Sequence, residues 1–287
     1  MSGFQTDWLE LREAADGNAR SAYLCAQLAA ALTPGRERRV VDLGSGTGAN
    51  LRYLAPRLGG DQHWLLVDHD QALLDYARLA TKAWIDTQGL KVSTDGGEFL
   101  VGGDRFSLGL RWRKADINLL LDRLITPDVD LVTASALLDL VSTEWIERLV
   151  QQCRAARCAL MLALSYDGRM TWQPALDADE AIRGLFNRHQ RTDKGFGRAV
   201  GPDGATEATR QLRGAAFEVL SDRSDWRLTG ADARLQRALL SGCAQAATAM
   251  NQALAGRIDG WLGQRLALIA HPEGEVTVGH VDLLGLP

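Results

Sequence analysis

The sequence predicts an α/β protein in which helices cover both faces of a mainly parallel sheet. From residue 39 onward, short apolar runs alternate with stretches of helical spacing, which is typical of strands joined by crossover helices. A glycine-rich turn follows the first of these runs and opens a helical stretch. The chain has 287 residues, 46% of them hydrophobic, which is enough for one large domain. We therefore expect a single domain over residues 1–287.

The chain before the first strand is expected to be a helical cover. Residues 7–32 carry apolar side chains at helical spacing, interrupted near Asp16-Gly17. This predicts two helices, with Pro34-Gly35 as the stop. We assign residues 1–36 to this cover.

The next part of the chain, residues 37–166, is the predicted ligand-binding core. Residues 91–104 are dense in glycine and acidic residues and form either a loop or an extra hairpin. Strands are expected at 39–43, 64–68, 106–112, 130–133 and 159–165, and helices at 49–58, 71–87, 118–124 and 143–156.

After residue 166 the alternating pattern stops. Residues 167–214 are rich in charge and glycine, and a connection of this length predicts loops that bind the substrate. Residues 215–287 are expected to hold the last strands, at 215–220 with an extension at 225–228, and at 275–284. Between them, residues 231–270 predict a helical insertion broken near Gly256 and Gly260, for which substrate binding and homodimer formation both remain open.

Composition disfavours several functional classes. A formal net charge of -4 gives no broad cationic field, so neither nucleic acid nor a membrane surface is an expected partner. The chain lacks an apolar run of about 18 residues and a signal-peptide pattern, which predicts a cytoplasmic protein. The four cysteines form no CxxC pair and are expected to be buried thiols, so no metal site is predicted: Cys25, Cys153, Cys158 and Cys243.

The strongest motif runs from Val40 to Gly48, where an apolar strand passes into a glycine loop that opens a helix. The loop reads GxGxG, with Asp42 two residues before its first glycine, whereas a dinucleotide-binding loop reads GxGxxG. An acid here would repel a pyrophosphate and attract an ammonium group. The motif therefore favours a nucleoside that carries an amino acid.

Two further acids follow neighbouring strands. Asp68 ends the second apolar run about 20 residues beyond the loop, where a carboxylate can accept both ribose hydroxyls. Asp116 follows the third strand and can accept the amino hydrogen of adenine beside the apolar Ile117.

These three elements, in this order, resemble the class I S-adenosylmethionine-dependent methyltransferase family over about residues 39–165. The resemblance implies a Rossmann-like three-layer sandwich, with a mostly parallel seven-stranded sheet and an antiparallel last strand. It also implies an enzyme with S-adenosyl-L-methionine as cofactor. The residues it assigns to the cofactor are Asp42, Gly44, Ser45, Gly46, Gly48, Asn50, Asp68, His69, Ala115, Asp116, Ile117, Thr133, Ala134 and Ser135.

By the same resemblance, residues 136–139 face the methyl acceptor. The tetrad by which family members methylate amino groups of bases or glutamine is absent from this segment. The expected reaction is methylation of oxygen, nitrogen or carbon in a small molecule, giving S-adenosylhomocysteine. Aminopropyl transfer and a non-catalytic, cofactor-binding subunit are the alternatives.

Candidate catalytic residues lie after the fourth and fifth strands. His189, Asp139 and Asp167 are candidate general bases, and His189 is preferred because an imidazole titrates near about pH 6.5. Tyr166, Arg191 and Lys194 are the candidate substrate-binding residues, with Arg191 suited to a carboxylate or phosphate. A solvated charged loop is the alternative for this stretch. Trp8 and Trp145 are expected in the core, and His280 is expected to point outward from the last strand.

Overall fold

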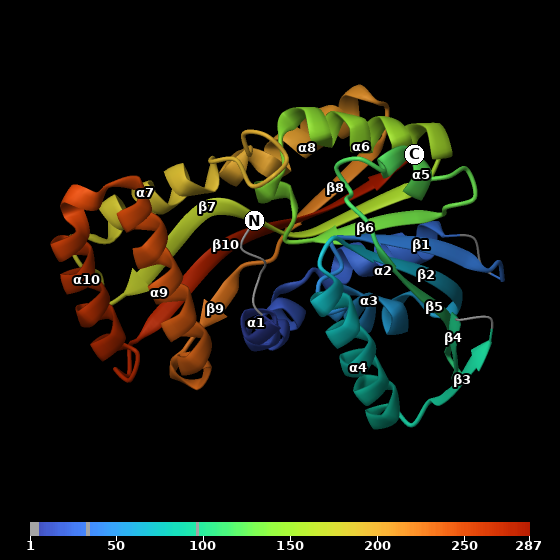
Figure 1. Cartoon of the computed structure of the whole chain (residues 1–287), viewed down its shortest axis with the longest axis horizontal. Helices are drawn as coiled ribbons and strands as arrows, with labels where there is room; N and C mark the ends of the chain where they lie inside the picture. Colours follow the sequence, from blue (N-terminus) through green and yellow to red (C-terminus); the bar gives the residue numbers. More distant parts are fainter. Residues whose placement is uncertain (1–5, 33–34, 96–97) are drawn as a thin grey trace.

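The computed structural model describes residues 6–32, 35–95 and 98–287, which form one ten-stranded sheet with helices on both faces (Figure 1). Pro34 and residues 96–97 lie outside the described residues. In spatial order the strands are β3 (Lys91–Asp95), β4 (Glu98–Gly102), β5 (Phe106–Lys114), β2 (Gly60–Asp68), β1 (Arg38–Leu43), β6 (Leu131–Ser135), β7 (Ala159–Gln173), β10 (Glu275–Leu286) and β8 (Glu218–Arg223), and β9 (Trp226–Leu228) pairs with β10.

Strand directions follow the Rossmann-like prediction. From β5 through β2, β1 and β6 to β7 all neighbours are parallel, and β10 is antiparallel to β7 and β8. The predicted antiparallel last strand is therefore confirmed. The sheet has more strands than the predicted seven, because β9 and the β3–β4 hairpin are added to it. Residues 91–102 thus take the hairpin alternative, in which Phe99 packs edge-on against Trp112 with 5.3 Å between ring centroids.

Helices form the two outer layers. One face carries α2 (Ala22–Ala31), α3 (Ala49–Leu58) and α4 (Gln71–Thr87), and the other carries α5 (Leu121–Leu124), α6 (Thr143–Ala156) and α8 (Gly204–Gly214). In α3, for example, Leu51, Leu54, Ala55 and Leu58 are buried, which is one stripe at helical spacing. Two apolar clusters, one beneath each helical layer, hold the sheet between them.

The two N-terminal helices are present, but they meet at a different place from the predicted one. α1 (Thr6–Ala19) runs through Asp16-Gly17, and the break comes at Arg20-Ser21. The reason is the Ser21 hydroxyl, which accepts a hydrogen bond from the backbone N–H of Leu24 and so caps α2.

Loops were predicted over residues 167–214, and this prediction is wrong for most of the segment. β7 continues to Gln173, and α7 (Asp179–Gln190), a 3-10 turn η2 (Gly201–Asp203) and α8 follow. The charges of this segment suggested a loop, but Arg169 pairs within the sheet with Asp167 and Asp225, so a strand can carry them. The next strand, β8, begins three residues later than predicted, since Ala215 and Ala216 end α8.

A third apolar cluster makes a lobe beyond the core. The extended ends of β7 and β10, together with β9, pack against α7, α9 (Ala233–Met250) and α10 (Ala255–Leu268). The insertion breaks at η4 (Gln252–Leu254), after a first 3-10 turn η3 (Gly230–Asp232). This break lies two residues before Gly256, close to the predicted position, whereas α10 continues through Gly260, where a single exposed glycine lowers helix propensity without ending the helix.

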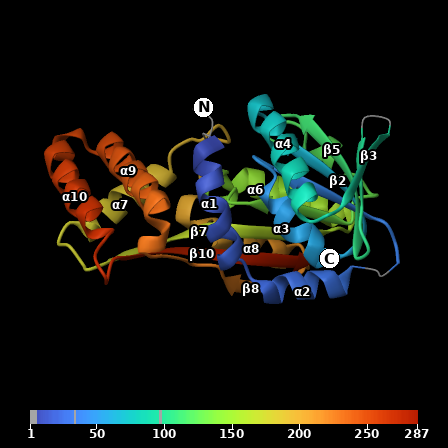
Figure 2. The ribbon, with the colours of Figure 1, turned by 90° about the horizontal axis from the view of Figure 1, so that it is seen from below.

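α1 stands between this lobe and the helices α3 and α4 (Figure 2). Trp8 of α1 packs against Trp226 of β9, and Glu13 accepts hydrogen bonds from Arg52 of α3. Among the helices that the structure describes, none is long and apolar enough to cross a membrane.

Candidate functional site

The glycine loop between β1 and α3 has the backbone that its sequence predicts. Gly44, Gly46 and Gly48 have φ values of 67°, 52° and 79°, a left-handed region that side chains with a Cβ rarely adopt. A Cβ on Gly48 would also come within 3.3 Å of Arg52, and one on Gly46 within 3.3 Å of Leu9 of α1. The loop is therefore closely covered by α1 on one side and by α3 and α4 on another.

Asp42 lies at the end of β1 beneath this loop and is completely buried, with 0% of its surface exposed. Its Oδ1 accepts a hydrogen bond of 2.7 Å from Nδ2 of Asn50, which also donates to Oγ1 of Thr133 at 3.1 Å. Its Oδ2 has no partner among the described residues. Burial raises the pKa of Asp42 to about 7. The site thus holds a carboxylate with a free oxygen that water does not reach.

Arg20, which the sequence analysis missed, completes this cluster. Its Nη1 donates to Oδ1 of Asn50 at 2.6 Å, and its guanidinium lies over the ring of Tyr53, 4.2 Å from the centroid. Only 6% of Arg20 is exposed, and in the described part of the chain Nε and Nη2 donate to no acceptor. No motif marks Arg20. Its one signal is a charge at the junction of α1 and α2.

Asp68 ends β2 beside the loop, as predicted. Its carboxylate accepts hydrogen bonds of 2.9 Å from the backbone N–H groups of Gly46 and Asp70, and His69 lies 3.3 Å from it. The backbone N–H of Ala115 donates to the carbonyl of Asp68 at 2.9 Å. This bond places the segment after β5 next to the end of β2.

That segment provides an apolar surface with one acid at its edge. Ala115 and Ile117 are buried, while Asp116 is exposed and accepts a hydrogen bond of 2.8 Å from the backbone N–H of Asn118. The structure therefore brings Asp42, Asp68 and Asp116 to one edge of the sheet, at the carboxyl ends of three neighbouring strands.

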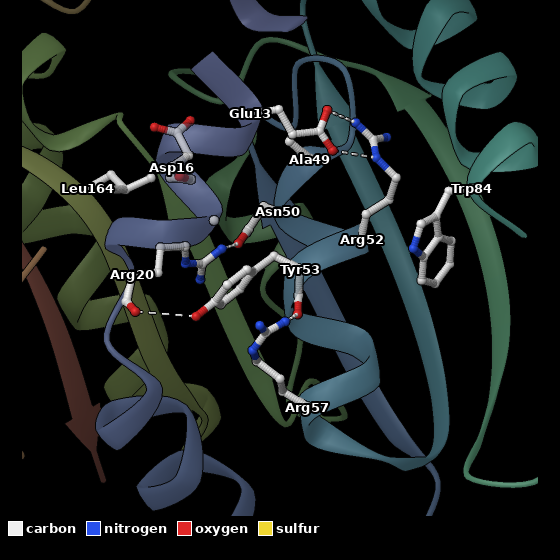
Figure 3. A pocket seen from close by; sticks show the side chains of 12 residues that line it. Glu13, Asp16, Arg20, Ala49, Asn50, Arg52, Tyr53, Arg57, Trp84 and Leu164 are labelled. Atoms are coloured by element: carbon white, nitrogen blue, oxygen red, sulfur yellow. Dashed lines mark hydrogen bonds and ion pairs between the residues drawn. The ribbon is translucent and has the colours of Figure 1, made fainter. Parts of the chain in front are cut away.

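A pocket of about 240 Å³ lies between α1 and α3 (Figure 3), and of the predicted cofactor residues only Asn50 and Ser135 line it. The sheet forms the inner end of the pocket through Ser135, the last residue of β6, and Leu164, which lies within β7. It is lined by Glu13, Asp16, Gly17, Arg20, Ala49, Asn50, Arg52, Tyr53, Arg57, Trp84, Ser135 and Leu164. Of the lining guanidinium groups, that of Arg52 is neutralised by Glu13, whereas Arg20 has no carboxylate partner among the described residues.

Two residues in left-handed conformation lie beside Ser135. Ala136 directly after β6 has a φ of 52°, and Leu164 within β7 has a φ of 54°. Neither is glycine, so each conformation has an energetic cost and persists only where the surroundings impose it. Ala134 and Thr133, both predicted cofactor residues, are buried in β6 just before this point.

Two of the predicted catalytic residues, Asp139 and His189, share one neighbourhood. Asp139 lies on the 3-10 turn η1 (Leu138–Leu140), is 6% exposed, and accepts a hydrogen bond of 3.1 Å from Nε2 of Gln190. Nζ of Lys194 lies 3.4 Å from Nδ1 of His189. Burial raises the pKa of Asp139 to about 6 against the opposing charges of Arg12 and Lys194, and burial lowers the pKa of His189.

The other predicted residues of this region have partners of their own. Asp167 is paired with Arg169, and Arg191 donates to Asp203 at 2.8 Å. The hydroxyl of Tyr166 donates to Oδ1 of Asn187 at 2.7 Å within the lobe. Lys194, the third predicted substrate residue, donates to Oγ1 of Thr192 at 3.0 Å.

The predicted orientation of His280 is wrong. This residue does not point outward from β10 but is buried with 5% exposure, 5.1 Å from Trp226 and 6.3 Å from Tyr166 between ring centroids. Simple alternation failed because the pairing of β10 with β7 shifts register beside this residue. Burial lowers the pKa of His280 to about 3, so the imidazole is neutral at pH 7. Trp145 and the four cysteines are buried as predicted, and Trp8 is half-buried against the lobe.

The structure is similar to known structures whose sequences share little identity with this chain. No protein-family model matches the sequence, and no curated protein does. Among solved structures, an S-adenosylmethionine-dependent methyltransferase from Geobacter sulfurreducens in complex with S-adenosylhomocysteine is 16% identical, with 99% of each chain covered and a TM-score of 0.46. A methyltransferase of the same description from Thiobacillus denitrificans is also 16% identical, with 99% of each chain covered and a TM-score of 0.44. A cyclopropane synthase from Mycobacterium tuberculosis is 12% identical over 91% of this chain and 82% of its own, with a TM-score of 0.45.

Proposed function

We propose that this chain is an enzyme that binds S-adenosylmethionine at the carboxyl edge of its sheet and transfers the methyl group to a small molecule. The observation that carries the proposal is the pair of unpartnered groups held together by Asn50. With respect to the described residues, Asp42 presents a free carboxylate oxygen and Arg20 presents two free guanidinium nitrogens. This arrangement is complementary to an amino-acid zwitterion, because Asp42 suits the ammonium group and Arg20 suits the carboxylate.

The nucleoside part fits the neighbouring strand ends. A carboxylate at Asp68 can exchange its present backbone donors for ribose hydroxyls, and His69 lies beside it. Ala115 and Ile117 offer the apolar surface for adenine, with Asp116 able to accept from the exocyclic amino group. A pyrophosphate would meet Asp42 and Asp68, two acids, instead of the amide groups that it requires.

When bound, S-adenosylmethionine supplies an electrophilic methyl group on a sulfonium. The chain's part in such a displacement is to hold donor and acceptor in line and to keep water out. Leu137 would lie 3.5 Å from a Cβ on Gly44, so the segment after β6 closes directly onto the glycine loop. Covered by α1 as well, the inner end of the pocket at Ser135 and Leu164 suits a small acceptor better than a polymer.

Asp139 is the general base that we favour in this proposal. It follows Ser135 by four residues, it is buried, and with a pKa of about 6 it is mostly ionised at neutral pH. An acceptor hydroxyl or ammonium group must lose a proton, and the carboxylate of Asp139 would take it. His189 remains the second candidate, because burial lowers the pKa of its imidazole and so keeps it neutral and able to accept a proton.

The variant Asp139→Asn is expected to lower the single-turnover rate of methyl transfer by roughly a hundredfold or more. In the parent protein the rate should fall as the pH drops below about 6, because Asp139 becomes protonated, and this acid limb should vanish in the variant. The measurement is made at saturating S-adenosylmethionine. Asp193→Asn, in an exposed loop, is the matched control. An unchanged rate in Asp139→Asn, with a loss in His189→Ala, would transfer the role to His189.

The function itself is tested by calorimetric titration of the purified chain. We expect S-adenosylhomocysteine to bind with a micromolar or lower Kd, and a nicotinamide dinucleotide not to bind. Incubation of candidate acceptors with donor labelled in the methyl group or in the aminopropyl group then separates methyl transfer from aminopropyl transfer. Absence of binding to S-adenosylmethionine and to its demethylated product would overturn the proposal.

A further inference from the structure

Asp282 is a fully buried acid that the proposed reaction does not use. It lies in β10, where the pairing with β7 shifts register between Val281 and Leu283. The exposed fraction of its side chain is 0%. Its Oδ1 accepts a hydrogen bond of 2.7 Å from the backbone N–H of Leu164, and its Oδ2 accepts one of 2.9 Å from the backbone N–H of Ser21. Each carboxylate oxygen therefore holds a different segment of backbone.

Both segments belong to the wall of the pocket. Ser21 directly follows Arg20, the residue whose guanidinium meets Asn50, and Leu164 lines the inner end of the pocket. These segments are 143 positions apart in the sequence, and Asp282 is a direct link between them. Replacing the carboxylate of Asp282 would therefore alter the positions of Arg20 and Leu164 together.

The backbone conformation of Leu164 explains why its N–H group needs a strong acceptor. A leucine with a φ of 54° is strained, and such a residue stays in place only when its surroundings hold it. The hydrogen bond from its N–H to a charged acceptor is of the stronger kind. A neutral side chain at position 282 could satisfy at most one of the two N–H groups with the same geometry, whereas a carboxylate accepts from both.

We propose that Asp282 is a positioning residue, which sets the distance between Arg20 and the inner wall of the pocket and thereby the fit of the amino-acid part of the ligand. This inference rests on the proposed function, since it names the ligand of the same pocket. It assigns to Asp282 no contact with the ligand.

The test compares Asp282→Asn with the parent protein in the binding of two probes. S-adenosylhomocysteine carries the amino acid, whereas 5′-methylthioadenosine has the same nucleoside thioether without it. We expect Asp282→Asn to raise the Kd for S-adenosylhomocysteine at least tenfold and to leave the Kd for methylthioadenosine within twofold. A general loss of structure would weaken both probes equally.

Asp222→Asn is the matched control. Asp222 lies opposite Asp282 in the register of β8 with β10 and accepts a hydrogen bond of 2.6 Å from the Ser21 hydroxyl. Unlike Asp282, it is exposed and is not the acceptor of the Leu164 N–H group. We expect its variant to bind S-adenosylhomocysteine within twofold of the parent. Hydrogen exchange adds a readout without ligand, since the amide of Leu164 should exchange at least tenfold faster in Asp282→Asn and at the parent rate in Asp222→Asn.

The outcomes separate this inference from the proposed function. If the parent binds neither probe, the proposed function fails, and hydrogen exchange still tests the link. If the parent binds both probes and Asp282→Asn loses affinity for both equally, or for neither, the positioning role is overturned. Should Asp282→Asn not fold, rapid exchange of the Leu164 and Ser21 amides in the folded parent would overturn it, and slow exchange at both would support it.

Discussion

Replacing Asp42 by Asn is expected to give a protein that is more stable than the parent in the absence of ligand and that binds S-adenosylhomocysteine about a hundredfold more weakly. Asp42 is buried without solvent, and one of its oxygens has no partner within the described ranges. An amide keeps the bond to Asn50 and removes the need to bury a charge. It also removes the charge that would attract the ammonium group of the ligand, about 3 kcal/mol on the scale of affinities.

The effect on stability depends on pH in a direction set by the pKa of Asp42. Burial raises this pKa from an ordinary value of 3.8 to about 7, so the folded state binds the proton more tightly than the unfolded state. The contribution of Asp42 to stability is therefore complete below about pH 4 and is lost as the pH rises through 7. Above pH 7 the ionised group costs up to about 4 kcal/mol, which the variant would recover.

Urea unfolding of the ligand-free proteins at pH 5 and pH 8 measures this difference. We expect the gain in unfolding free energy of Asp42→Asn to be larger at pH 8 than at pH 5. Asp70→Asn is the control, because Asp70 caps α4 from an exposed position where Asn caps equally well. Equal stability of Asp42→Asn and parent at pH 8 would show that Asp42 is compensated by Arg20, and the charge argument would fail.

Arg20→Met is expected to weaken S-adenosylhomocysteine binding by about a hundredfold and to leave methylthioadenosine binding within twofold. A buried guanidinium that pairs with a ligand carboxylate is worth about 3 kcal/mol, whereas an exposed pair is worth less than about 1 kcal/mol. Methionine keeps an unbranched apolar side chain beside Tyr53, while the guanidinium over the ring is removed. Competition of the two probes in the same titration measures the selectivity directly.

Arg57→Met provides a matched control for this prediction. Arg57 lies over the same Tyr53 ring, 3.7 Å from its centroid, but it is exposed and its Nη1 donates to the carbonyl of Tyr53. Its removal should change the affinity for S-adenosylhomocysteine less than threefold. Equal losses in the two variants would mean that the general positive charge of the pocket, and not a contact of Arg20, holds the ligand.

The half of the candidate site that we propose for cofactor binding was predictable because its residues are local in sequence. A few neighbouring residues are enough to encode each of its features: the three glycines with positive φ, the acid before them and the acid at the next strand end. The parallel sheet then brings these features to one edge. The alternation of strands and helices likewise depends on periodicity within short windows.

Other residues required the tertiary structure. Arg20 is important because Asn50, 30 positions later, receives its hydrogen bond, and no spacing rule relates the two residues. Charge in residues 167–173 suggested a loop, yet Arg169 is balanced by two acids and the strand continues. His280 was misplaced because a register shift interrupts the alternation on which the prediction depended.

The position of β10 between β7 and β8 has a consequence for the order of folding. This strand closes contacts across large stretches of chain, as the 261 positions between Ser21 and Asp282 illustrate, and such non-local pairing forms late because loop closure must precede it. Until β10 inserts, two strand edges are bare and the chain is prone to aggregate. We therefore expect the sheet to be completed and the pocket between α1 and α3 to form in the same late step of folding.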